Sequence, residues 1–133
     1  MVGALACGDA FDTRRELPAE LAVEYSGPLA SNMEVPEPTV AVLVGALTIR
    51  AASVFDQTGY QLRARAYVRE GDAPSLLRVV VSSTLPGDGL AVIAMQVYSV
   101  RVVLPAGTYT LQLVRVDDGG PERVELEQVV VVP

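Results

Sequence analysis

Apolar and polar residues alternate with a period of two along most of the chain from residue 39 onward. In the segment 62–69, leucine, alanine and valine take the even positions. The odd positions hold Arg63, Arg65, Tyr67 and Arg69. Successive side chains of an extended strand point to opposite faces, so this segment is predicted to be a half-buried strand with a polar outer face. The same alternation predicts strands over 77–82, 109–113 and 124–130.

Short stretches rich in Gly, Pro and Asp separate these strands, at 70–72, 86–89, 105–107 and 117–121. Gly adopts a positive φ without strain, and Asp hydrogen-bonds within its own turn, so each stretch predicts a turn. Further strands are predicted over 39–45, 46–54 and 21–25, and two more within the long apolar run 90–104.

Seven to eight short strands with regular turns predict an all-β fold, an antiparallel β-sandwich. A Pro-x-Gly turn at 105–107 leads into a strand that begins Thr108-Tyr109, which is frequent in immunoglobulin-like sandwiches, so we expect the sandwich to be immunoglobulin-like. A closed barrel is the alternative architecture. The sandwich is predicted to occupy residues 21–133, and residues 1–20 to form an N-terminal tether. Within the tether, Asp12 or Thr13 is placed to cap a short helical turn over 14–16, which Pro18 would end.

The composition excludes several classes of partner. A net charge of −6 over 133 residues argues against a nucleic-acid partner, because phosphate-backbone binding needs concentrated positive charge. All ten basic residues are arginine, and they form no polybasic run that would attract anionic lipid. No apolar run approaches the roughly 20 residues of a membrane helix. We therefore expect membrane contact only through an attached lipid.

The chain has no histidine and one cysteine. This composition cannot form Ser-His-Asp or Cys-His catalytic arrangements, and it cannot form an internal disulfide or a cysteine-based zinc site. We therefore predict a protein that is not an enzyme and that uses no cofactor or metal. An enzyme based on Asp, Glu or Arg is the alternative. Calcium at Asp117 and Asp118, with Asp88, is a further alternative, although hairpin turns explain these residues fully.

The N-terminal segment carries Ala4-Leu5-Ala6-Cys7-Gly8. Bacterial lipoproteins place small and branched residues before the cysteine that receives lipid, so this segment is interpreted as the remnant of a lipobox with Cys7 as the lipid attachment site. The polar, proline-bearing stretch that follows suits a tether between membrane and domain. The alternative interpretation is a lone cysteine near the N-terminus.

Two groups of residues are candidates for specific roles. One is an interaction face that carries Arg63, Arg65, Tyr67 and Arg69, and Arg78 if its strand pairs beside them. Arg and Tyr are favoured at interface hot spots, and Arg grips carboxylate or phosphate with two bonds. The alternative is a solvated face crossed by ion pairs to Glu125 or Glu127. The other candidate is Tyr109, placed to form a structural tyrosine corner.

Four stretches carry a resemblance to a known group of proteins. They are Gly59-Tyr60-Gln61-Leu62, Val68-Arg69-Glu70-Gly71, Leu85-Pro86-Gly87 and Val100-Arg101-Val102-Val103-Leu104-Pro105-Ala106-Gly107-Thr108-Tyr109. Over residues 39–132 the chain resembles small bacterial envelope lipoproteins with a single immunoglobulin-like domain. The pair of cysteines common in that group is absent, with Gly59 at the first of the two places. The resemblance implies a fold and a compartment but no activity.

Together these features predict a non-enzymatic, lipid-anchored module of the bacterial cell envelope that binds another envelope protein or has a structural role. The alternative is a soluble assembly subunit that docks by β-strand pairing. It would use the last strand, which ends in four valines over 129–132 and is predicted to carry Val124, Leu126 and Val130 on its apolar face.

Overall fold

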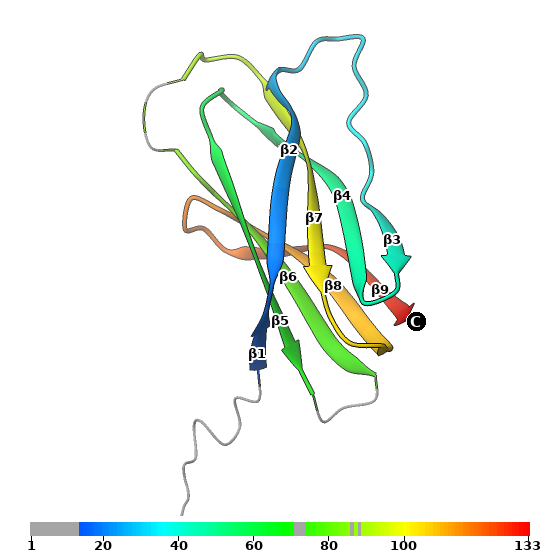
Figure 1. Ribbon diagram of the computed structural model, residues 1–133. Coiled ribbons are helices and arrows are strands. Elements are labelled where there is room, and N and C mark those ends of the chain that lie inside the picture. The colour runs from blue at the N-terminus through cyan, green and yellow to red at the C-terminus, as the bar shows by residue number, and fades with distance from the viewer. Residues whose placement is uncertain (1–13, 71–73, 86, 88) are drawn as a thin grey trace, which may run out of the picture.

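The computed structural model describes residues 14–70, 74–85, 87 and 89–133, and these fold into a two-layer β-sandwich (Figure 1). The predicted all-β sandwich is confirmed, with nine strands among these described residues. They are β1 (Arg14–Leu17), β2 (Ala19–Pro28), β3 (Thr39–Leu43), β4 (Ala46–Phe55), β5 (Gln61–Arg69), β6 (Ser75–Thr84), β7 (Ala94–Val103), β8 (Gly107–Asp117) and β9 (Glu122–Val132).

The strands form one sheet of five, here sheet A, in the order β1-β5-β6-β8-β9, and one of four, sheet B, in the order β2-β7-β4-β3. Every neighbouring pair is antiparallel except β6 and β8, which run parallel. The expectation of a purely antiparallel sandwich was therefore wrong. The reason is that β7 belongs to sheet B, so the chain leaves sheet A after β6 and re-enters it in the same direction.

The core lies between the two sheets (Figure 1). It consists of the inward-facing residues of both sheets. On β6 the alternation is regular, because Leu77, Val79 and Val81 are buried while their neighbours are partly exposed. Tyr98 on β7 is the largest fully buried side chain. Burial of apolar surface at about 25 cal/mol per Å² is the main force that holds the two sheets together.

Residues 14–16 belong to β1, and the expected helical turn was wrong. They pair with β5, with Arg14 opposite Arg69 and Leu17 opposite Ala66. Leu17 is only 8% exposed and packs into the core. Pairing and burial together outweigh the local capping signal. After Pro18 the chain passes to sheet B as β2. Both β1, which precedes residue 21, and β2, which contains it, therefore belong to the sandwich (Figure 1).

Two other apolar segments, 39–54 and 90–104, were each expected to form two strands. The segment 39–54 forms the hairpin β3–β4, with Gly45 at φ 73° in the turn. The run 90–104 was expected to hold two strands, and this was wrong, since it holds β7 alone. Its first part, Leu90–Ile93, lies outside the sheets, where the backbone of Leu90 hydrogen-bonds Thr58.

The expected apolar face of the last strand was partly wrong. Between the pairs Leu113–Leu126 and Val114–Val124, β9 carries one extra residue, Glu125. Such a β-bulge reverses the face on which the preceding residues lie. Val124 therefore lies on the outer face and is 52% exposed, while Val130 stays in the core.

The described part of the chain contains no helix of the length and apolar character that a membrane crossing requires.

Candidate functional site

The outer face of sheet A carries the predicted interaction residues. On β5, Arg63, Arg65 and Arg69 are exposed and Tyr67 is half-buried, because this strand alternates between core and solvent. The register of β5 with β6 places Arg78 directly opposite Tyr67. The structure thus brings all five residues onto one face.

Strand β1 adds residues to this face that the sequence did not predict. Glu16 lies opposite Tyr67 in the β1–β5 ladder, and its carboxylate accepts two hydrogen bonds from Arg65, at 2.8 Å from Nη2 and 3.1 Å from Nε. The hydrogen bond from Arg65 lowers the pKa of Glu16, and the same bond raises the pKa of Arg65. This bidentate geometry holds the guanidinium of Arg65 in one orientation.

Tyr67 lies beside two guanidinium groups. The Cζ atom of Arg14 is 5.3 Å from the centroid of the Tyr67 ring, and the Cζ atom of Arg65 is 5.6 Å from it. Both distances are typical of cation–π contacts, in which a guanidinium is attracted to the electron-rich face of an aromatic ring. The Tyr67 ring therefore helps to hold the guanidinium groups of Arg14 and Arg65 close together on this face.

A cavity of about 110 Å³ opens beside Tyr67. It is lined by Arg14, Tyr67, Arg69, Leu76 and Arg78. Arg78 donates to Glu122 Oε1 at 2.8 Å through Nη2, but its Nε is buried and has no hydrogen-bond partner among the described residues. A buried N–H without an acceptor costs free energy.

The ion pairs on this face differ from those expected. Arg65 pairs with Glu16 and Arg78 with Glu122, where the sequence suggested Glu125 or Glu127. Glu125 is the bulge residue of β9, and Glu127 accepts a hydrogen bond from Gln112 on β8. Both residues lie at or next to the bulge in β9. The sequence did not reveal this bulge, and it therefore did not reveal the pairing of these two residues.

Charge is distributed unevenly over sheet A. Six of the ten arginines lie on β1, β5 and β6, although the whole chain is acidic. At the opposite edge, β9 carries three glutamates and one arginine. The arginines, the tyrosine ring and the cavity suit a partner that presents carboxylate groups, because guanidinium forks match the geometry of carboxylates.

The remaining predicted residues lie elsewhere. Cys7 is outside the described residues. Tyr109 on β8 is only 6% exposed, and its hydroxyl donates to the carbonyl oxygen of Pro105 at 2.8 Å. This bond joins the strand to the turn that precedes it, which is a structural role.

The aspartates considered for calcium are engaged in other contacts. The carboxylate of Asp117 accepts hydrogen bonds from Ser83 at 2.9 Å, from Arg115 at 2.8 Å and from Arg123 at 3.2 Å. Asp118 adopts a left-handed conformation at φ 47° in the turn, and Asp88 lies outside the described residues. Within residues 14–70, 74–85, 87 and 89–133, no cluster of three or more His, Cys, Asp or Glu residues could hold a metal ion.

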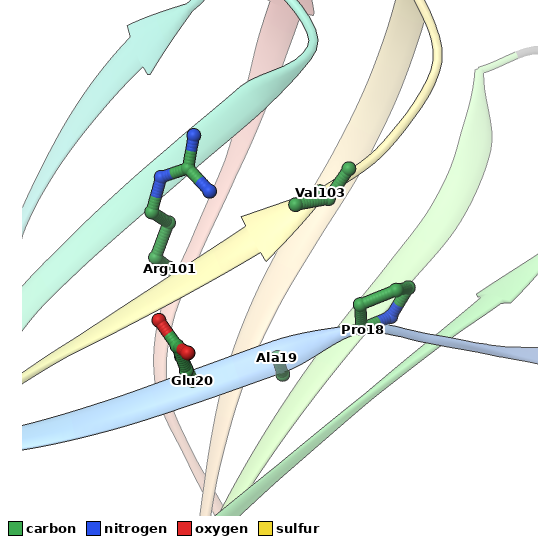
Figure 2. A pocket seen from close by; sticks show the side chains of 5 residues that line it. All are labelled: Pro18, Ala19, Glu20, Arg101 and Val103. Carbon is green, nitrogen blue, oxygen red and sulfur yellow. The ribbon is translucent and has the colours of Figure 1, made fainter.

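A second hollow, of about 280 Å³, lies over sheet B (Figure 2). Pro18, Ala19 and Glu20 line it from the start of β2, and Arg101 and Val103 line it from β7. Glu20 and Arg101 face each other in the β2–β7 ladder, so their opposite charges complement one another.

Sequence reasoning missed Arg14, Glu16 and Leu76. The first two were visible as a charged cluster, but four residues are too few to distinguish a strand from a helical turn by periodicity. Leu76 became part of the cavity only through the pairing of β6 with β5.

Comparison of the chain with protein-family models, with curated proteins and with solved structures finds no match.

Proposed function

We propose that the chain is a non-enzymatic binding module of the bacterial cell envelope that contacts an acidic surface of a partner protein through the outer face of sheet A. The observation that carries this proposal is the cavity beside Tyr67, with three arginines in its lining. A carboxylate of the partner would accept hydrogen bonds from the guanidinium groups that line the cavity.

The envelope setting belongs to the same proposal. It is supported by Ala4-Leu5-Ala6-Cys7-Gly8 and by the resemblance to envelope lipoproteins with an immunoglobulin-like domain. The hydrogen bond from Tyr109 to Pro105 is the kind of contact that immunoglobulin-like sandwiches use at a tyrosine corner, and it supports the immunoglobulin-like part of the resemblance.

Binding is tested with a fluorescently labelled oligoglutamate, with an uncharged oligoglutamine as the reference probe. Leu76→Trp fills the cavity without changing any charge, so we expect it to weaken oligoglutamate binding by about tenfold or more. Val103→Trp is the matched control, because Val103 is an exposed valine that lines the hollow over sheet B. Equal weakening by both variants, or equal binding of the two probes, would contradict the proposal.

The envelope setting is tested by labelling cells of the source bacterium with an alkyne fatty acid. We expect the natural protein to take up the label and to enter the detergent phase. The Cys7→Ser variant should do neither, because it lacks the thiol that receives lipid. Unlabelled protein confined to the cytosol would refute the anchored setting while leaving the binding measurement intact.

A second candidate function is a soluble assembly subunit that docks by strand pairing. It is favoured by the position of β9, which is the last strand in the order of sheet A. An edge strand exposes unpaired backbone groups that another strand can use.

A further inference from the structure

The two sheets have four edge strands, and three of them are poor templates for another strand. β1 has four residues and β3 has five, which leaves few backbone groups for a ladder. β2 is longer, but its register shifts between Val23 and Tyr25 and it ends at Pro28. Short length, bulges and proline are the usual protections of exposed edges.

Strand β9 is the exception, with 11 residues, and its two halves differ. The first half carries the bulge at Glu125 together with Glu122, Arg123 and Glu127. The second half, 128–132, has no charged residue. Its outer face presents Val129 and Val131, which are 61% and 64% exposed. Within the part of the chain that the structure describes, this half carries none of the charges, prolines or bulges that protect the other edges.

We propose that a second copy of this chain pairs with β9 in antiparallel orientation about a two-fold axis at Val130, so that two copies of sheet A become one continuous sheet. This inference rests on the second of the two proposed functions. In this register Val129 of each copy lies opposite Val131 of the other. Residues that face each other across an antiparallel ladder share a face, so the exposed valines form one apolar cluster.

The charges on β9 select this register and favour a second copy as the occupant. Pairing about Val130 places Glu127 opposite Pro133 and keeps every glutamate of β9 outside the valine ladder. Pairing about Glu127 would bring two carboxylates face to face, which is destabilising. Pairing about Gln128 would place Glu127 opposite Val129, and pairing about Val129 would place it opposite Val131. The uncharged segment 128–132 is therefore complementary to itself about Val130, where its exposed valines face each other.

The paired stretch is short, so the dimer should be weak. A ladder of five residues from each chain buries less than the roughly 1,200 Å² of a stable interface. We expect a dissociation constant in the micromolar range or weaker, about 10 μM to 1 mM.

The first test is sedimentation equilibrium of the full chain up to about 2 mM, which spans that range. We expect the natural chain to dimerise and Val129→Lys to remain monomeric, because opposed lysines would replace the apolar contact. Val124→Lys is the matched control, since Val124 is also exposed on the outer face of β9 but lies on the far side of the bulge. It should dimerise like the natural chain.

A monomer at every concentration would overturn the inference, and so would equal loss of dimer in both lysine variants. A second measurement distinguishes failure of the dimer from failure of strand docking in general. A labelled peptide of alternating lysine and valine is titrated onto the chain. If the monomeric chain binds the peptide and Val129→Lys does not, strand docking stands with a different partner. If neither the natural chain nor Val129→Lys binds the peptide, both the proposed dimer and the proposed strand-docking function fail.

The register is tested by disulfide trapping in a Cys7→Ser background. In the proposed register, a mixture of Val129→Cys and Val131→Cys chains should oxidise to a heterodimer, because the two positions lie directly opposite each other at a spacing that a disulfide can bridge. Val129→Cys alone should react slowly, since its nearest copy lies diagonally. Faster oxidation of Val129→Cys alone than of the mixture would overturn the register about Val130.

Discussion

Asp117 illustrates how single residues at the end of β8 contribute to stability. Burial raises the pKa of this carboxyl, but the hydrogen bonds from Arg115 and Ser83, with the nearby guanidinium charges, outweigh burial and lower the pKa below 3.8. A group with a lowered pKa in the folded state stabilises the fold above its ordinary pKa and loses that contribution as the pH falls through the folded value.

We therefore expect Asp117→Asn to lower the free energy of unfolding by about 1–2 kcal/mol near neutral pH, a figure kept modest because the side chain is 34% exposed. The difference from the natural chain should shrink as the pH falls below 3.8, where Asp117 itself takes up a proton. Urea denaturation at both pH values measures it. Asp118→Asn, at the exposed neighbouring turn residue, is the control and should have little effect; a difference that does not change with pH would contradict the account.

At this scale the sequence predicted which residues share a face but not which atoms they contact. Arg63, Arg65, Tyr67 and Arg69 alternate within one strand, so their common orientation is a local property. The partner of Arg65 is Glu16, which comes from a strand far away in the sequence. Such partners depend on strand pairing, which local periodicity does not encode.

At the scale of elements, the connection before β7 is held by contacts with a distant loop. Thr58 N donates to the carbonyl of Leu90 at 3.0 Å, and Leu90 N donates to Thr58 Oγ1 at 2.8 Å. A Cβ atom added to Gly89 would lie 1.8 Å from the carbonyl oxygen of Thr58, so only glycine permits this approach.

Gly89→Ala should therefore lower the free energy of unfolding by about 2 kcal/mol, because the loop has to move away from Thr58. Gly87→Ala is the matched control, since a Cβ at Gly87 meets nothing within 4 Å. Its effect should stay within about 0.5 kcal/mol. Urea denaturation of both variants measures the difference, and equal effects would show that the contact with Thr58 contributes nothing to stability.

The same loop explains an error in the division of strands. The residues Leu90–Ile93 are apolar, and apolar runs of this length are typical of buried strands. In the structure Leu90 and Ile93 are 66% and 55% exposed, because backbone contacts with Thr58 and Leu29 hold the segment outside the ladder. The bulge at Glu125 was hidden for a similar reason, since one extra residue leaves the apolar pattern of β9 almost unchanged.

At the scale of the whole molecule, Tyr98 links stability to alkaline pH. It is 1% exposed in the core between the sheets, and burial raises its pKa from 10.0 to about 12. A raised pKa in the folded state means that the stabilising contribution is fully present below pH 10.0 and is lost as the pH rises toward about 12.

We expect the free energy of unfolding to fall by about 2–3 kcal/mol across that interval, because the ionised phenolate is accommodated only in the unfolded chain. Urea denaturation through the interval measures the loss, and tyrosinate absorbance should show a late-ionising tyrosine that the Tyr98→Phe variant lacks. Tyr98→Phe should flatten the alkaline decline. An unchanged decline in this variant would assign it to other groups.

The two-layer architecture was predictable, because alternation and turn residues recur over most of the chain. The order of strands within the sheets was not. It depends on pairings between distant segments, such as β1 with β5 and β2 with β7, for which alternating residues give no preference among partners. The interaction face was thus partly predicted, while the cavity, which needs β1, β5 and β6 together, was not.

The parallel pairing of β6 and β8 has a consequence for the order of folding. Sheet A contains two hairpins, β5–β6 and β8–β9, and each can form from neighbouring residues alone. Their junction along β6 and β8 cannot, because the chain between them must first cross to sheet B and return. Closing so long a loop costs entropy before any ladder bond repays it. We therefore expect this junction to form late in folding, with the two hairpins as preassembled units.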